Sequence, residues 1–148
     1  MKHVKKSVLL WYSPHEMFDL VTAVKDYPRF LPWCTSATIV SRDDALVSAD
    51  LHVRWAGARF EMRTRNPKQR PGFMAIHLEH GPFRRFEGEW RLVALRPDAC
   101  KVAFSLDYEF DRAWMTAAAG PVFDRIANTL VDAFVQRALT LPSVGTGP

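Results

Sequence analysis

The sequence has few of the residues that hold a fold together by covalent or metal bonds. Its 148 residues include only two cysteines, Cys34 and Cys100. Neither has a second cysteine or clustered histidines nearby at zinc-ligand spacing, so we expect two buried thiols in a reducing compartment. The apolar runs are broken by charge or proline well short of the roughly 18–20 residues that span a bilayer. The basic segment 1–6 leads only into a short apolar run, 8–12, which predicts no signal peptide and a cytoplasmic protein.

Sequence motifs of catalysis and metal binding are also missing. There is no glycine-rich phosphate loop, nucleophile elbow or metalloprotease helix in the chain. His77 and His80 are three residues apart in a predicted strand and would face opposite sides of it. We therefore predict no metal site and no required cofactor.

The composition is that of one ordinary domain, 1–148. Hydrophobic residues make up 48% of the chain and charged residues 24%, which is enough apolar surface for a core. The net charge of +4 would help the protein approach RNA or an anionic membrane surface, but demonstrates neither. We expect no DNA partner, and we keep peripheral contact with the inner membrane as an option.

The first third of the chain predicts a strand, a capped helix and an aromatic loop. A strand is expected over residues 4–12, followed by Ser13, which can cap a helix and form a capping box with Glu16. Apolar residues at helical spacing extend this helix over 14–25. The proline-rich aromatic loop 27–33 that follows either fills the core or forms a lip at the mouth of a cavity.

From residue 34 to residue 110 the hydrophobic period is two, which predicts antiparallel strands with one buried and one wet face. After 110 the period becomes helical, and we expect Pro121 to open a long amphipathic helix. Residues 141–148 read as a frayed tail. This order predicts an α+β fold with one helix covering the apolar face of a sheet, with either solid packing or a pocket between them.

Acidic side chains fall on the outward phase of the predicted strands. This phase carries Asp50, Glu61, Glu87, Glu89, Asp107 and Glu109. General acid–base catalysis needs a titratable group inside a cleft, and the inward phase offers almost none. We therefore predict no catalytic residues, and an enzyme is the least favoured class of function.

Basic side chains gather on the outer phase of two neighbouring strands and their connection. They are Arg54, Arg59, Arg63, Arg65, Lys68 and Arg70. This group is either an ordinary solvated sheet face or a patch that binds ribosomal phosphates or another anionic surface.

Several segments of the chain closely resemble one known family. They are YSPHEMFDLV at 12–21, DYPRFLPWC at 26–34, GPFRRFEGEW at 81–90, CKVAF at 100–104 and AFVQRA at 133–138. The sequence resembles the coenzyme Q-binding proteins and RatA-type ribosome association toxins of the START-like, polyketide cyclase/dehydrase-like superfamily. The resemblance covers residues 3–140.

This resemblance implies a helix-grip fold, in which a curved antiparallel sheet wraps around the long C-terminal helix and encloses a hydrophobic cavity. It implies a non-enzymatic carrier of ubiquinone or a similar polyisoprenoid lipid that supports respiratory electron transport. The alternative is a toxin that binds the large ribosomal subunit, blocks subunit association and so inhibits translation.

We can assign residues to the expected cavity from the inward phases of the sheet and helix. The lining should comprise Trp55, Phe60, Met62, Trp90, Phe104, Tyr108, Phe123, Ile126, Ala127, Leu130 and Phe134. A quinone head needs one or two hydrogen bonds, which Thr64, His80 or Tyr108 could supply. For His80, the plainer reading is a histidine that finds its partner at a strand end.

Overall fold

The computed structural model describes residues 1–55 and 57–141, without the side chains of Trp55 and Ala58. In this range, seven strands form one antiparallel sheet in the order β1-β7-β6-β5-β4-β3-β2. The strands are β1 (Lys2–Leu10), β2 (Cys34–Arg42), β3 (Leu46–Trp55), β4 (Ala58–Gln69), β5 (Phe73–His80), β6 (Phe83–Arg96) and β7 (Ala99–Phe110). The helices are α1 (Pro14–Thr22), the 3₁₀ helix η1 (Val24–Arg29) and α2 (Ala113–Thr140).

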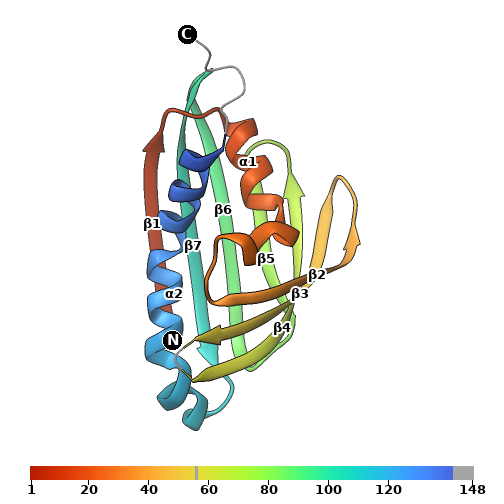
Figure 1. The fold of residues 1–148 in the computed structure, drawn as a ribbon, viewed down its shortest axis with the longest axis vertical. Helices are drawn as coiled ribbons and strands as arrows, with labels where there is room; N and C mark the ends of the chain where they lie inside the picture. Colours follow the sequence, from red (N-terminus) through yellow and green to blue (C-terminus); the bar gives the residue numbers. More distant parts are fainter. Residues whose placement is uncertain (56, 142–148) are drawn as a thin grey trace.

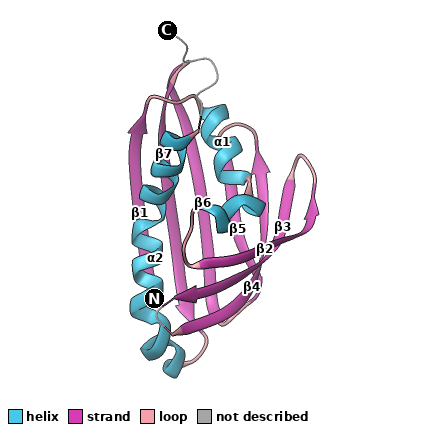
Figure 2. Ribbon diagram, in the orientation of Figure 1, coloured by secondary structure: helices cyan, strands magenta, loops and turns pink. Residues whose placement is uncertain are grey.

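All three helices lie on one side of the curved sheet. Figure 1 shows α2 running along β1 and β7, with α1 beside it. Helix α1 contacts β6 and β7, and η1 contacts β2. Figure 2 shows the same two layers, with β2, β3 and β4 curling toward the helices. We call the helix-covered side of the sheet the inner face and the opposite side the outer face. The predicted α+β, helix-grip architecture is confirmed.

The beginning of α1 follows the prediction and its end does not. The Ser13 hydroxyl accepts from the Glu16 backbone N–H at 3.1 Å, and the Glu16 carboxylate accepts from the Ser13 N–H at 3.1 Å. The predicted capping box is therefore confirmed. The α-helix ends at Thr22 and the chain continues as η1, which contains Pro28. The first strand ends at Leu10, two residues earlier than expected.

Helix α2 begins eight residues before the predicted start. Pro121 lies inside it rather than at its first turn. The apolar face of α2 continues toward the N-terminus through the buried residues Met115 and Ala119. Their packing stabilises the helix before Pro121, although a proline inside a helix removes a backbone hydrogen bond. The prediction that Pro121 opens the helix was therefore wrong. Residues 142–148 of the predicted tail lie outside the described residues.

The expected alternation of buried and exposed residues is present in the sheet. Along β7, for example, Val102, Phe104 and Leu106 are buried with 1–4% exposure. The core carries a network of aromatic side chains in contact with α2. It comprises Phe60, Phe83, Phe86, Tyr108, Phe110 and Phe123 at one end, and Tyr27, Phe30, Trp90, Phe104 and Phe134 at the other.

Candidate functional site

A small apolar cavity lies between the sheet and α2. Its volume is about 70 Å³. Its walls come from η1 and the segment after it, from the inner face of β3–β7, and from α2. The lining residues are Val24, Tyr27, Trp33, Leu51, Met62, Thr64, Asn66, Ile76, Phe86, Trp90, Phe104, Leu106, Phe123, Ile126, Ala127, Leu130 and Phe134.

Most of the residues assigned to the cavity from the sequence lie in its wall. Those are Met62, Trp90, Phe104, Phe123, Ile126, Ala127, Leu130 and Phe134. Phe60 lies outside the wall and packs against Phe83, Phe110 and Phe123. The side chain of Trp55 lies outside the described part of the structure.

Tyr108 also lies outside the wall, because its hydroxyl is held by α2. The hydroxyl donates a hydrogen bond to the carboxylate of Asp124, and Lys2 lies 3.4 Å from the same carboxylate. Burial, and then this hydrogen bond, raise the pKa of Tyr108 well above its usual range. The side chain thus serves as a link between β7 and α2, and the structure corrects its expected place at a ligand head group.

His80 lies on the outer face, so its predicted inward direction was wrong. The β4–β5 register pairs Arg63 with His80 and Thr64 with Leu78, which leaves Glu79 as an extra residue. Such a β-bulge reverses the facing of the residues beyond it. Leu78 consequently shares the inner face with Thr64, while the exposed His80 shares the outer face with Arg63.

Two polar side chains of β4 are buried in the cavity wall. Thr64 is 2% exposed and Asn66 is 4% exposed. The Thr64 carbonyl accepts a hydrogen bond from the Ser48 hydroxyl at 3.0 Å. The Oδ1 atom of Asn66 is buried without a hydrogen-bond partner among the described residues. Thr64 is among the residues predicted from the sequence and Asn66 is not, although the inward alternation of 62 and 64 continues to 66.

The aromatic segment 27–33 packs into the core, as the first of its two predicted roles requires, and its residues Tyr27 and Trp33 also form part of the cavity wall. Tyr27, Leu31 and Trp33 are buried, and the Tyr27 hydroxyl donates to the Val21 carbonyl. Burial raises the pKa of Tyr27 above its usual range. Burial also raises the pKa of the Cys34 thiol to about 11, and that of Cys100 to about 11, so both thiols are protonated near neutral pH.

The outer face of β3 and β4 carries four of the predicted basic residues. Arg54 lies directly opposite Arg59 in the register of these strands. Arg63 binds Asp50 through two hydrogen bonds, of 2.7 and 3.0 Å, and this pair holds the pKa of Asp50 below its usual range. Arg65 lies beyond that pair and is exposed. Within the described part of the chain, Arg54, Arg59 and Arg65 have no ion pair within 4.0 Å.

Lys68 and Arg70 do not belong to this basic surface. Lys68 pairs with the buried Met74 and so shares its inner face. Arg70 binds Asp19 of α1 at 2.5 Å and lies over the Phe18 ring. The six basic residues therefore divide between two faces of the molecule, and the prediction of one patch is corrected to Arg54, Arg59, Arg63 and Arg65.

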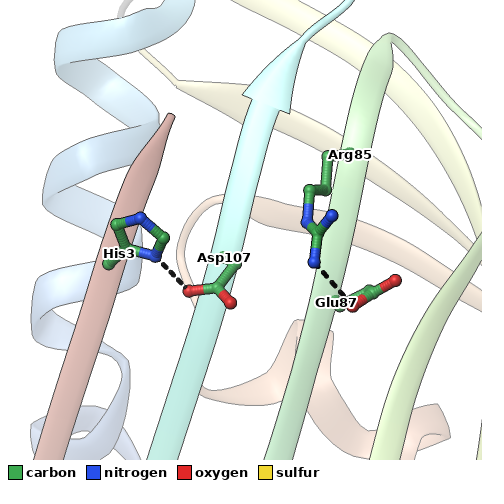
Figure 3. A network of polar contacts seen from close by, with 4 residues as sticks. All are labelled: His3, Arg85, Glu87 and Asp107. Carbon is green, nitrogen blue, oxygen red and sulfur yellow. Dashed lines mark hydrogen bonds and ion pairs between the residues drawn. The ribbon is translucent and has the colours of Figure 1, made fainter.

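The outer face of β1, β7 and β6 is charge-balanced. Figure 3 shows His3 of β1 in contact with Asp107 of β7, and beside them Arg85 of β6 in contact with Glu87. The Arg85–Glu87 distance is 3.3 Å. Acidic side chains therefore accompany the basic ones here. On β3 and β4, Glu61 lies 3.3 Å from His52 on the face that carries the arginines.

Two further properties bear on function. Among the described residues, no three His, Cys, Asp or Glu side chains are grouped so that they could hold a metal ion. In the same part of the chain, no helix is both long enough and apolar enough to cross a membrane.

Comparison with known proteins finds a family model, curated relatives and solved structures. Residues 10–135 match the family described as polyketide cyclase / dehydrase and lipid transport. The ribosome association toxin RatA of Pseudomonas aeruginosa is 38% identical over 139 residues, which cover 94% of this chain and 96% of that protein. The mitochondrial coenzyme Q-binding protein COQ10 homolog B of Xenopus laevis is 27% identical over 138 residues, 90% of this chain and 56% of that protein. The Zhui aromatase/cyclase of Streptomyces sp. R1128 superposes with a TM-score of 0.84 over 99% of both chains at 17% identity, which shows a shared fold.

Proposed function

The chain belongs to the polyketide cyclase / dehydrase and lipid transport family, and on that premise we propose that it associates with the ribosome through the outer face of β3 and β4. The observation that carries the proposal is the 38% identity to a ribosome association toxin over nearly the full length of both proteins. We propose further that it binds the large subunit, blocks subunit association and so inhibits translation, and that it does this without catalysis.

The arginines of the outer face support this proposal physically. Arg54 and Arg59 are cross-strand neighbours of like charge, an arrangement that is unfavourable unless an anion lies between them. A backbone phosphate of ribosomal RNA would supply that charge and accept hydrogen bonds from both guanidinium groups. Arg65 is exposed farther along the same face of β4, so a second phosphate could be bound there.

The interior supports a non-enzymatic function. The residues that line the cavity include no Asp, Glu, His, Cys, Lys or Arg in the described part of the chain. The hydroxyl of Tyr27, a titratable lining residue, already donates a hydrogen bond to the Val21 carbonyl. A general acid or base within reach of a bound substrate is therefore not provided by these side chains.

The proposal is tested by sedimentation with separated ribosomal subunits. We expect the wild-type protein to pellet with the large subunit, and the triple variant Arg54→Gln, Arg59→Gln, Arg65→Gln to remain largely in the supernatant. Arg125→Gln is the control for the loss of one exposed arginine elsewhere, because Arg125 is exposed on α2 and has no ion pair among the described residues. Equal pelleting of all three proteins would refute the proposed surface, and no pelleting of the wild type would refute ribosome association.

A second candidate function is the binding of an apolar ligand, ubiquinone included, in the cavity between the sheet and α2. The observation that favours it is an apolar space bordered by side chains of both layers. At about 70 Å³, this space is smaller than the roughly 300–1,000 Å³ of typical small-molecule pockets. A polyisoprenoid tail could enter only if α2 or the segment 24–33 moved outward, so we rank this function second.

Organic extraction of the purified protein, followed by mass spectrometry, tests the second function. Stoichiometric quinone that is absent from the Leu130→Arg variant would support it, since Leu130 lies in the cavity wall and is only partly buried. Thermal unfolding of the variant checks that it is folded. An extract that stays empty after the wild type is incubated with ubiquinone would refute quinone binding.

A further inference from the structure

Asn66 is the feature of the interior that the packing of the core does not explain. The residue is only 4% exposed and lines the cavity, and its Oδ1 atom has no hydrogen-bond partner among the described residues. An unpaired buried acceptor lowers stability, because the hydrogen bonds it makes to water when the chain is unfolded are lost. Apolar residues of similar size would avoid this cost at such a position.

The neighbouring polar groups do not supply the missing donor. The Ser48 hydroxyl donates to the Thr64 carbonyl at 3.0 Å, and the Tyr27 hydroxyl donates to the Val21 carbonyl. The Arg65 side chain extends from the same strand but belongs to the outer face. None of these groups donates to Oδ1, and a molecule inside the cavity that Asn66 lines could supply the missing hydrogen bond.

We propose that Asn66 anchors a hydroxyl-bearing amphipathic ligand in this cavity. The inference rests on the second candidate function, in which the cavity holds a ligand, and it adds the chemical class of that ligand. A hydroxyl group would donate to Oδ1, while the apolar body of the ligand would contact side chains such as Trp90, Phe104 and Phe134. A quinone carbonyl cannot make this hydrogen bond because it has no proton, whereas a phenol or a quinol can.

The size of the cavity limits how such a ligand enters. Cavities of roughly 150 Å³ admit benzene, whereas this one measures about 70 Å³. Binding of an aromatic ring therefore requires the wall to open. Of the apolar lining residues, Leu130 and Ile76 are only partly buried against the core, so we expect the wall to open at these positions first. A single trapped water is the competing occupant, since it too could donate to Oδ1.

Isothermal titration with two matched probes separates these occupants. The probes are 4-propylphenol and propylbenzene, which differ by one hydroxyl group, and the proteins are wild type, Asn66→Leu and Thr64→Val. We expect Asn66→Leu to weaken 4-propylphenol binding by roughly fivefold or more, and to leave propylbenzene binding unchanged or tighter. Thr64→Val should change the ratio of the two affinities less. Asn66→Ala serves as the second variant, with thermal unfolding as the check that each variant is folded.

The outcomes distinguish the anchor from the cavity itself. If both probes bind the wild type and Asn66→Leu changes both affinities by the same factor, the cavity binds ligands but Asn66 is not the anchor, and a trapped water is favoured. If neither probe binds the wild type, both the anchor and the proposed ligand-binding function are refuted. A loss confined to 4-propylphenol supports the anchor.

Discussion

Truncation of Phe134 to alanine tests whether α2 is held to the sheet by aromatic packing beside the cavity. The ring is 1% exposed and makes edge-to-face contacts with three other rings. The centroid distances are 5.4 Å to Tyr27, 5.1 Å to Phe30 and 5.0 Å to Trp90. These residues come from η1, the segment after it and β6, so one side chain joins three parts of the fold to α2.

The expected loss of stability follows from this burial. Removal of a buried phenylalanine ring usually costs about 3–5 kcal/mol in the free energy of unfolding. Domains are stable by about 5–15 kcal/mol in total, so Phe134→Ala should remove a large part of the stability. For a chain of this length the melting temperature should fall by roughly 6–20 °C. Chemical denaturation and calorimetry measure the two quantities.

The control and a second readout make this prediction specific. Val93→Ala truncates an apolar side chain that is 51% exposed, and should change stability by no more than about 0.5 kcal/mol. Because Phe134 lines the cavity, its truncation should enlarge that space, and saturating benzene should stabilise the variant more than the wild type. If Phe134→Ala lowers the free energy of unfolding by less than about 1 kcal/mol, or if benzene stabilises the variant and the wild type equally, the proposed packing role of Phe134 is refuted.

Three further predictions concern single positions. Ser13→Ala removes the capping hydroxyl of α1 and should cost about 1 kcal/mol by chemical denaturation; an unchanged midpoint would contradict the cap. Arg63→Gln removes the hydrogen bonds that lower the pKa of Asp50, so an NMR titration should show that pKa rise toward its ordinary value. Because Asp50 has its lowered pKa only in the folded state, the Arg63–Asp50 pair stabilises the wild type above the unfolded-state pKa of Asp50, and this stabilisation is lost as the pH falls through the folded-state pKa. The same Asp50 titration in the variant and the wild type would contradict the role of Arg63. Gly88→Ala would place a Cβ 3.0 Å from the Ser105 carbonyl oxygen, so we expect a loss of about 1–3 kcal/mol, and a neutral effect would show that the strands can separate there.

The facing of most strand residues could be predicted because polar and apolar side chains alternate strictly. The alternation in 49–53, 60–64 and 102–110 matches their burial in the structure. This is also why the assignment of residues such as Met62 and Trp90 to the inner face succeeded. Periodicity reports which face a residue occupies, since only one face of such a sheet is apolar.

The facing of strand residues was predicted wrongly where a β-bulge or a misplaced strand end shifts the alternation of inward and outward side chains. The β-bulge at Glu79 reverses the facing of His80, and nothing in the composition of 73–80 marks the extra residue. Asn66-Pro67 resembles a turn, but β4 continues to Gln69. A strand that is taken to end at this dipeptide leaves out Asn66 and gives no basis for the inward direction of Lys68.

The size of the cavity could not be predicted from the sequence. The same aromatic and aliphatic side chains are compatible with solid packing or with a large pocket. The outcome depends on ring orientations such as the edge-to-face contact of Trp90 with Phe134, at an interplanar angle of 71°. Such angles follow from the packing of residues far apart in the chain, and pattern alone does not encode them.

The central claim is that exposed arginines on the outer face of β3 and β4 bind ribosomal phosphates. The most direct measurement is the affinity of the protein for the purified large subunit at several salt concentrations. If Arg54 and Arg59 share one phosphate and Arg65 binds a second, the log–log slope should be about −1.4 to −1.8, and affinity should fall roughly 7- to 12-fold between 50 and 200 mM salt. Replacing all three by glutamine should bring the slope close to zero. A wild-type affinity that does not depend on salt, or a slope that the triple variant leaves unchanged, would contradict the account.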